Sequence, residues 1–420
     1  MRNIYNKKAQ NAYEGQPLNK KPIYPKWWMK GLIWLNTFPR LWFKRHRLVR
    51  VNMETLDKKA PYLLFANHNS YLDYKVAAKS VFPRSAANIV ALDAYIKREH
   101  LVRWIGGIGK RKFVTDASLV RQILYVLKTH KIPLIMYPEA HYSLVGLPSS
   151  LPSGLAKLVK MSKVPLVILI NHGHHIAKPH WHHHRHVIKT ESVITQVVTK
   201  DEVKSLSIAE IEQRLQNAFD YNDYEWLINQ NIKIKSKHRA EGLHHVLFQC
   251  PHCLKEGAMT SKKTVLKCEH CQTTYDVDEQ YRLSSPQFEM PFFLVSDWFH
   301  WQKKHVQHEV LKPDYFIRLD VDVALLPDAK GFIPVGKGVL EHSQKGFKLT
   351  FILNNYQKTI KKTPRNQYAL HVEFSKASQK ISFSTDTQTC FMTLLTPGIS
   401  ATKLYLATEA LHNMFCPNKH

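Results

Sequence analysis

The chain has 420 residues, of which 44% are hydrophobic, so its length predicts two to four globular domains. Its formal net charge of +27 predicts attraction to an anionic partner, which could be nucleic acid, an anionic membrane leaflet or an acidic substrate carrier. No apolar run approaches the ~20 residues of a membrane-spanning helix, and Met1–Gln16 lacks the apolar core of a secretory signal, so we expect a cytoplasmic protein.

Residues 1–50 form a basic segment that is rich in tryptophan. The stretch PKWWMKGLIWLNTFPRLWFKRHRLVRV interleaves lysine and arginine with four tryptophans, namely Trp27, Trp28, Trp34 and Trp42. Aromatic rings at headgroup level, next to cations that attract anionic lipid, are typical of a segment that lies on a membrane surface. We expect Pro39 to break or kink its helix. An amphipathic helix that covers a soluble core is the alternative.

Residues 51–235 alternate short apolar runs with longer mixed segments. The runs PYLLFA, ANIVALDAY, IPLIMYPE and VPLVILIN predict buried strands, whereas DASLVRQILYVLKTHK and SGLAKLVKMSK have helical spacing and basic last turns. The stretch LSIAEIEQRLQNAFDYNDYEWLINQ predicts one or two further helices. Strands that alternate with helices predict an α/β domain, in which a sheet is layered with helices.

Polar residues follow the first predicted strand, Pro61–Ala66. His68 lies at the strand's exit, and Asp73 follows it with four residues between them. A carboxylate on the next turn can reach a ring nitrogen of the histidine and orient it. Active sites of such sheets collect beyond the strand ends, where Glu139 also lies, directly after LIMYP. The alternative is a helix cap with a histidine and an aspartate nearby by chance.

The stretch NHGHHIAKPHWHHHRH, Asn171–His186, holds eight histidines. A transition-metal site is one interpretation, although such runs bind metals loosely and this one contains no carboxylate or cysteine. A loop that binds phosphates, and becomes more cationic as the pH falls, is equally open.

Residues 236–285 contain four of the six cysteines, after a basic polar linker, KIKSKHRAEG. They form the turns CPHC and CEHC, fourteen residues apart: Cys250, Cys253, Cys268 and Cys271. Two such turns can present four thiolates to one tetrahedral ion, so we expect a zinc ribbon and not a disulfide framework. His252 and His270 are competing ligands, although sulfur is favoured. Four protein ligands leave no open position, so this zinc should be structural.

Residues 286–420 differ in character from the rest of the chain. Short alternating runs such as YFIRLDVDVALL, YALHVEFS and KISFSTDT are separated by Gly, Asn and Lys. This pattern predicts an antiparallel β-rich C-terminal domain, preceded by an aromatic helix, FFLVSDWFHWQKKHVQHEV.

The stretch NHNSYLD resembles the His-x4-Asp block of the glycerolipid acyltransferase family, whose best-known members acylate 1-acylglycerol-3-phosphate to phosphatidic acid. GGIGKRKFV, MYPEAHYS and VPLVILI resemble the second, third and fourth blocks of that family and follow in the family's order. The resemblance covers residues 61–170 and does not extend to the zinc ribbon or to the C-terminal domain.

The resemblance implies transfer of a fatty acyl group from an acyl thioester to the hydroxyl of a lysophospholipid or glycerol-phosphate lipid. The donor would be acyl-CoA or acyl-acyl carrier protein. His68 would be the general base, and Asp73 would fix its tautomer and stabilise the imidazolium. Glu139 would bind the acceptor's glycerol or support the site.

The second and third blocks depart from the family's pattern. An arginine expected a few residues after the glycines is absent, and Asp116 lies near its place. Ala140, His141 and Tyr142 replace the usual Gly-Thr-Arg. The residues that we expect to bind the acceptor's phosphate instead, as separate point contacts, are Lys110, Arg111, Lys112 and His141.

We therefore expect an enzyme of phospholipid biosynthesis, bound peripherally to the inner face of the cell membrane. Its partners would be an anionic membrane surface, a lysophospholipid and acyl-CoA or acyl carrier protein, and nucleic acid is not expected. One alternative is a nucleic-acid-binding zinc-ribbon protein, which leaves the four ordered blocks unexplained. Another is a catalytically impaired membrane scaffold with the same fold, which the missing arginines suggest.

Overall fold

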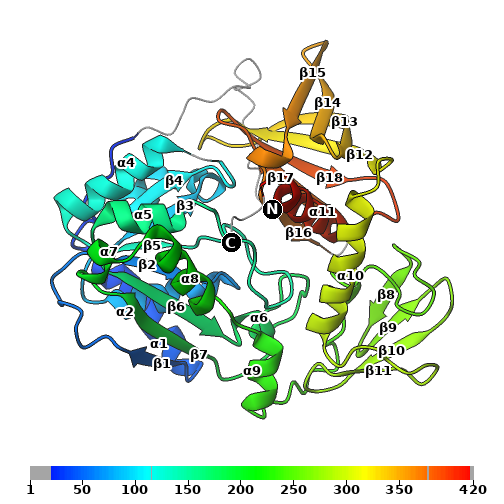
Figure 1. Cartoon of the computed structure of the whole chain (residues 1–420), viewed down its shortest axis with the longest axis horizontal. Coiled ribbons are helices and arrows are strands. Elements are labelled where there is room, and N and C mark those ends of the chain that lie inside the picture. The colour runs from blue at the N-terminus through cyan, green and yellow to red at the C-terminus, as the bar shows by residue number, and fades with distance from the viewer. Residues whose placement is uncertain (1–19, 115, 376–377, 417–420) are drawn as a thin grey trace.

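The computed structural model describes residues 20–114, 116–375 and 378–416, and three β-sheets with packed helices make up this part of the chain (Figure 1). The stretch Met1–Gln16 and the beginning of the tryptophan-rich segment, up to residue 19, lie outside the described residues. Within the described ranges, no helix is long and apolar enough to cross a membrane.

The first sheet has seven strands in the order β1-β7-β6-β2-β5-β3-β4. The strands are β1 Arg47–Val51, β2 Leu63–Ala66, β3 Ala87–Ala91, β4 Gly107–Lys110, β5 Leu134–Met136, β6 Leu166–His172 and β7 Glu191–Val198. The five strands from β6 to β4 pair in parallel, whereas β7 is antiparallel to β6. Parallel neighbours need crossover connections, which helices provide here. The prediction of an α/β layered sheet is confirmed.

Helices lie on both faces of this sheet. The α-helices are α1 Met29–Phe43, α2 Tyr71–Val81, α3 Glu99–Trp104, α4 Ala117–Tyr125, α5 Leu155–Ser162, α6 His174–Ala177, α7 Glu202–Ser205, α8 Ile208–Ala218 and α9 Asp223–Asn229. Shorter elements are the 3-10 turn η1 Leu92–Tyr95 and the π-helical turn η2 Val126–His130. Helix α1 continues through Pro39, so the expected break does not occur there.

Residues of β2 alternate between the two faces of the sheet. Leu63 and Phe65 belong to a hydrophobic cluster to which α4, α5 and α8 contribute. Leu64 belongs to a second cluster, together with Leu41 of α1 and Val76 of α2. Because both faces are covered, every residue of β2 is buried, which explains why the sequence shows a continuous apolar run there.

The second and third sheets are antiparallel. The second sheet contains β8 Met259–Lys262, β9 Val265–Cys268, β10 Thr274–Val277 and β11 Leu283–Ser284. The third, in the order β15-β14-β13-β12-β18-β17-β16, contains β12 Phe316–Leu326, β13 Ile333–Ser343, β14 Gly346–Leu353, β15 Tyr356–Lys362, β16 His371–Phe374, β17 Gln379–Ser384 and β18 Thr389–Leu394. The remaining elements are the 3-10 turns η3 Leu243–His245 and η4 Pro364–Asn366 and the helices α10 Val295–Val310 and α11 Ala401–Phe415. The predictions of an aromatic helix and an antiparallel β-rich region are confirmed.

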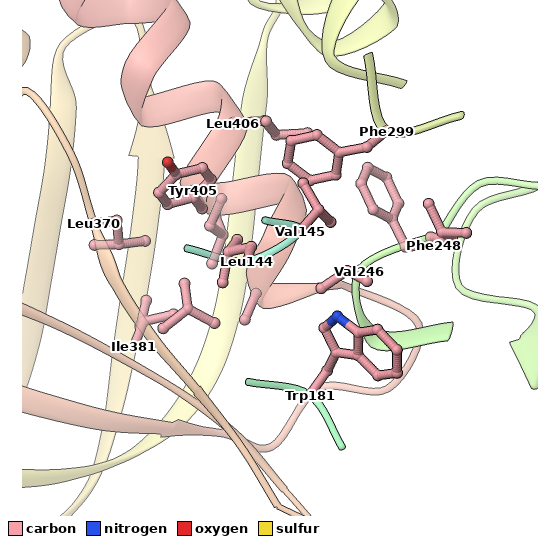
Figure 2. Packing of buried hydrophobic residues seen from close by; sticks show 14 of the residues in the cluster. Leu144, Val145, Trp181, Val246, Phe248, Phe299, Leu370, Ile381, Tyr405 and Leu406 are labelled. Carbon is pink, nitrogen blue, oxygen red and sulfur yellow. The ribbon is translucent and has the colours of Figure 1, made fainter. Parts of the chain in front are cut away.

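The C-terminal part of the chain shares a hydrophobic core with the part before residue 235. Leu144 and Trp181 belong to the same buried cluster as Phe248 and Tyr405. Figure 2 shows Leu144 and Val145 beside α11, which carries Tyr405. The predicted domain boundaries stay a prediction, but packing continues across them, so the third sheet and α11 lie against loops of the first sheet.

Candidate active site

His68 lies in the loop that joins β2 to α2, at the carboxyl end of the parallel strands. Ser70 caps α2, and Asp73 completes the cap because its Oδ2 accepts hydrogen bonds from the amides of Asn69 and Ser70 at 2.6 and 2.7 Å. The same Oδ2 lies 3.1 Å from His68 Nδ1. Asp73 is therefore a helix cap and also a carboxylate that orients His68.

The imidazole ring of His68 packs against two tyrosine rings but remains partly exposed to solvent. Its ring lies 4.3 Å from the ring of Tyr137 and 4.4 Å from that of Tyr142, between centroids, and its side chain stays 22% exposed. Nδ1 faces an ionised carboxylate and so carries the proton, which leaves Nε2 as the acceptor. No hydrogen bond involves Nε2 among the described residues. This nitrogen is available to take a proton from a substrate.

Asp73 has a second histidine partner, which our reading of the sequence did not pair with it. His174, in α6, places its Nδ1 2.5 Å from Asp73 Oδ1, so the carboxylate bridges two imidazoles. Burial alone would raise the pKa of Asp73, but hydrogen bonds from His174 and His68 outweigh it and lower the pKa to about 2. The only sequence signal for His174 is that it follows β6 closely, as His68 follows β2.

The turn that carries His174 is fixed by another buried acidic side chain, that of Asp223. It accepts hydrogen bonds from the amides of Gly173 and His175 at 3.1 and 3.2 Å, on either side of His174. Burial raises the pKa of Asp223 to about 8 despite these bonds. Asp223 was also missed, because it lies at the start of α9, far along the chain from α6.

Glu139 lies behind His68 in the interior of the protein. Its Oε2 accepts a hydrogen bond from the backbone amide of His68, and its Oε1 accepts one from the amide of Ser149, both at 2.9 Å. Burial raises the pKa of Glu139 to about 7. Strands β2 and β5 are parallel with Phe65 opposite Met136, which brings the two strand ends together. The carboxylate thus positions the His68 loop, and the predicted contact with the acceptor's glycerol stays a prediction.

Two of the predicted phosphate-binding cations contact the C-terminal part of the chain. Arg111 is buried and donates hydrogen bonds to the carbonyls of Pro327 and Thr387, at 2.6 and 2.9 Å, in the C-terminal part of the chain. Lys112 Nζ lies 3.2 Å from Nε2 of His371 in β16. Burial lowers the pKa of Lys110. Arg111 and Lys112 join the first and third sheets, so their binding of phosphate stays a prediction.

Asp116, which stands near the place of the expected arginine, is a helix cap. It precedes α4, and its carboxylate accepts a hydrogen bond from the amide of Ser118 at 2.7 Å. An arginine could not accept this hydrogen bond, so the departure from the family's pattern has a local structural reason.

His141 and Tyr142 lie between the first sheet and the C-terminal part. The buried ring of His141 packs against Phe113 and Tyr405, and burial lowers its pKa to about 4. The ring of Tyr142 contacts the rings of both His68 and His180, and His180 donates a hydrogen bond to the carbonyl of Val372 at 2.7 Å. His141 therefore packs against α11, and Tyr142 connects His68, through His180, to strand β16 of the third sheet.

Comparison with known proteins finds little similarity. No protein-family model and no curated protein matches this chain. One solved structure that this chain distantly matches is the 1-acyl-sn-glycerophosphate (LPA) acyltransferase PlsC from Thermotoga maritima, at 15% sequence identity and a TM-score of 0.39. The match covers 49% of this chain and 80% of that one. So distant a likeness carries no argument about chemistry, which must come from the residues around His68.

The four predicted cysteine ligands come together next to the second sheet. The Sγ atoms of Cys250 and Cys271, and those of Cys253 and Cys268, are 3.7 Å apart, and all four lie within 4.8 Å of one another. A tetrahedral zinc with Zn–S bonds of about 2.3 Å requires Sγ atoms about 3.8 Å apart. The cluster therefore fits one metal ion, and its four thiolates would close the coordination sphere.

Freshly purified protein should contain zinc in the cysteine cluster, and Cys268→Ser should remove it. We expect the variant to lose about 5 °C or more of thermal stability, because the ion joins two turns that otherwise separate. The arrangement around His68 should persist, since the cysteines are not among the residues around it. Metal analysis and calorimetry measure this, with Cys416→Ser as the control. Equal losses in the control, or no zinc in the parent protein, would contradict the assignment.

Proposed function

We propose that this chain is an acyltransferase that moves a fatty acyl group from an acyl thioester to the hydroxyl of a lysophospholipid or glycerol-phosphate lipid. The observation that carries the proposal is the His68–Asp73 pair. Asp73 holds Nδ1 at 3.1 Å, and Nε2 has no hydrogen-bond partner in the described part of the chain, at the carboxyl end of parallel strands. Such a pair is suited to removing a proton from a hydroxyl group.

In the proposed reaction, the acceptor hydroxyl attacks the carbonyl carbon of the thioester directly. His68 Nε2 takes the hydroxyl proton as the C–O bond forms, and Asp73 stabilises the imidazolium. The C–S bond then breaks, and the leaving thiolate receives that proton from His68. The products are an ester and a free thiol, so no serine or cysteine nucleophile is needed. Glu139 and His174 act as positioning residues, since each contacts the His68 loop or Asp73.

We further propose that α1 holds the enzyme at the cytoplasmic face of an anionic membrane. Helix α1 buries Met29, Thr37 and Leu41, but Trp27 and Trp42 beside and within it are 79% and 75% exposed. Exposed lysine and arginine accompany them. Aromatic side chains next to cations favour the interface of anionic lipid. The acceptor lipid would then reach the site from the membrane.

The double variant Trp27→Ala/Trp42→Ala should bind vesicles that contain anionic lipid about tenfold or more weakly, because each indole contributes apolar area to the interface. Co-sedimentation measures the affinity. Tyr356→Ala is the matched control, since Tyr356 is 72% exposed at the distant β14–β15 turn. These two substitutions test the surface alone, whereas deleting residues 1–50 would also expose the core around Leu41. Unchanged binding in the double variant would rule out this surface as the anchor.

A catalytically impaired scaffold of the same fold is the second candidate. It is favoured by Arg111, whose guanidinium is hydrogen-bonded to Pro327 and Thr387. One assay separates the two candidates. Purified protein is incubated with acyl-CoA or acyl-acyl carrier protein and with either 1-acylglycerol-3-phosphate or a neutral lysolipid, and released thiol and new ester are both measured. Product formation supports the enzyme, and binding of the lipids without product supports the scaffold.

A further inference from the structure

Three metal-ligating side chains from two separate segments meet on the surface. His184 belongs to the histidine-rich stretch, whereas His238 and Glu241 belong to the predicted linker. His238 Nδ1 lies 2.7 Å from Glu241 Oε1, and His184 Nε2 lies 3.8 Å from Glu241 Oε2. One ligand atom from each side chain lies within 4.8 Å of the other two. The carboxylate that the histidine-rich stretch lacks is thus supplied by the fold.

A third histidine, His182, connects the two segments. His182 is buried, its Nε2 donates a hydrogen bond to the carbonyl of His238 at 2.5 Å, and its Nδ1 accepts one from the amide of His184 at 3.0 Å. A single neutral imidazole can make both bonds, so His182 joins the backbones that carry two of the three ligands. Glu241 is also fixed, because it accepts a hydrogen bond from the amide of Lys263 at 3.2 Å.

We propose that His184, His238 and Glu241 bind a divalent transition-metal ion. Two imidazoles and a carboxylate are a ligand set that zinc and its neighbours prefer. Ligand atoms at tetrahedral zinc, with bonds of about 2.0–2.1 Å, lie about 3.4 Å apart. Glu241 offers one carboxylate oxygen to each histidine, Oε1 at 2.7 Å from His238 and Oε2 at 3.8 Å from His184, and a bound ion would take the place of the His238–Glu241 hydrogen bond. All three side chains are partly exposed, which lets an ion reach them from solvent.

Such an ion would link two functional regions of the chain. His184 lies on the same histidine-rich stretch as His174, the partner of Asp73. His238 and Glu241 lie on the segment that leads into the cysteine cluster. An ion between them would restrain both segments at once. With three protein ligands, this site also keeps an open position, unlike the four-cysteine site.

The experiment measures Zn²⁺ binding to the full-length protein by equilibrium dialysis with metal analysis. Wild type should bind one ion more per chain than His184→Ala or Glu241→Gln, and each substitution should weaken that binding by about tenfold or more. Glutamine keeps a carbonyl oxygen for the hydrogen bond from the Lys263 amide, so folding, checked by circular dichroism, should persist. Retention of the cysteine-bound zinc in both variants distinguishes the two sites.

His183→Ala is the matched control, because it removes a neighbouring histidine of the same stretch that is outside the three-residue cluster. Its zinc content and affinity should equal those of wild type. If His183→Ala weakens binding as much as His184→Ala, the stretch chelates metal loosely and no defined site exists. Equal zinc content in wild type and Glu241→Gln would overturn the proposal as well.

Discussion

Replacing His68 by alanine should lower the rate of acyl transfer about a hundredfold or more, because it removes the group that we propose accepts the hydroxyl proton. The loss should appear in kcat, since proton transfer belongs to the transition state and not to ground-state binding. The side chain is partly exposed, and the cap of α2 depends on Ser70 and Asp73, so the variant should fold. Steady-state kinetics with acyl-CoA or acyl carrier protein and the lysolipid measure the effect.

His100→Ala is the control for this experiment. His100 lies on the exposed surface of α3, where its ring contacts Trp104. This variant should keep the activity of wild type. Full activity in His68→Ala would refute the proposed mechanism and leave that residue as part of a turn. Intact lipid binding with no activity in either wild type or variant would favour the scaffold.

Asp73→Asn should cost about as much activity as the loss of His68, for a different reason. An amide can donate its own hydrogen to His68 Nδ1, which favours the tautomer with a protonated Nε2 and so removes the base. It also cannot stabilise an imidazolium. The contact with His174 Nδ1 is disturbed in the same way, because the neutral side chain replaces a carboxylate that bridges two imidazoles. Both kcat and thermal unfolding should be measured.

The stability lost in Asp73→Asn should depend on pH. The pKa of Asp73 in the folded state, about 2, lies below the value of about 3.9 in an unfolded chain. The carboxylate therefore stabilises the fold above about pH 4, and this contribution disappears as the pH falls toward 2. The difference in melting temperature between wild type and Asp73→Asn should accordingly shrink over that range. A constant difference would contradict the assigned hydrogen bonds.

Ser70→Ala separates catalysis from helix capping. The Ser70 hydroxyl accepts a hydrogen bond from the Leu72 amide at 3.2 Å but does not touch the His68 ring. Its loss should destabilise the protein by about 1 kcal/mol and leave most of the activity. If Ser70→Ala were as inactive as Asp73→Asn, the activity lost in the latter would follow from the helix cap and not from the tautomer of His68.

Several features of the fold and site could be predicted because they depend on neighbouring residues. A short continuous apolar run with a cap after it indicates a buried strand and a helix start, and β2 and α2 follow this pattern. The His68–Asp73 contact joins residues only five positions apart. The two Cys-x-x-Cys turns are likewise local, and their thiolates meet within 4.8 Å. Helix α1 continues through Pro39 without the expected break, and Leu41, two residues further on, is buried in the core.

The sequence by itself thus determined the local geometry around His68 and the cysteine turns, since hydrogen bonds over a few residues decide such geometry. Only the tertiary structure decided which distant groups join them. His174 reaches Asp73 across 101 residues through the pairing of β6 with β2, and Arg111 reaches Thr387 across 276 residues. Glu241 completes the histidine cluster in the same way. Residue periodicity assigns strands and faces, but it does not specify strand order or register, and these set contacts between distant segments.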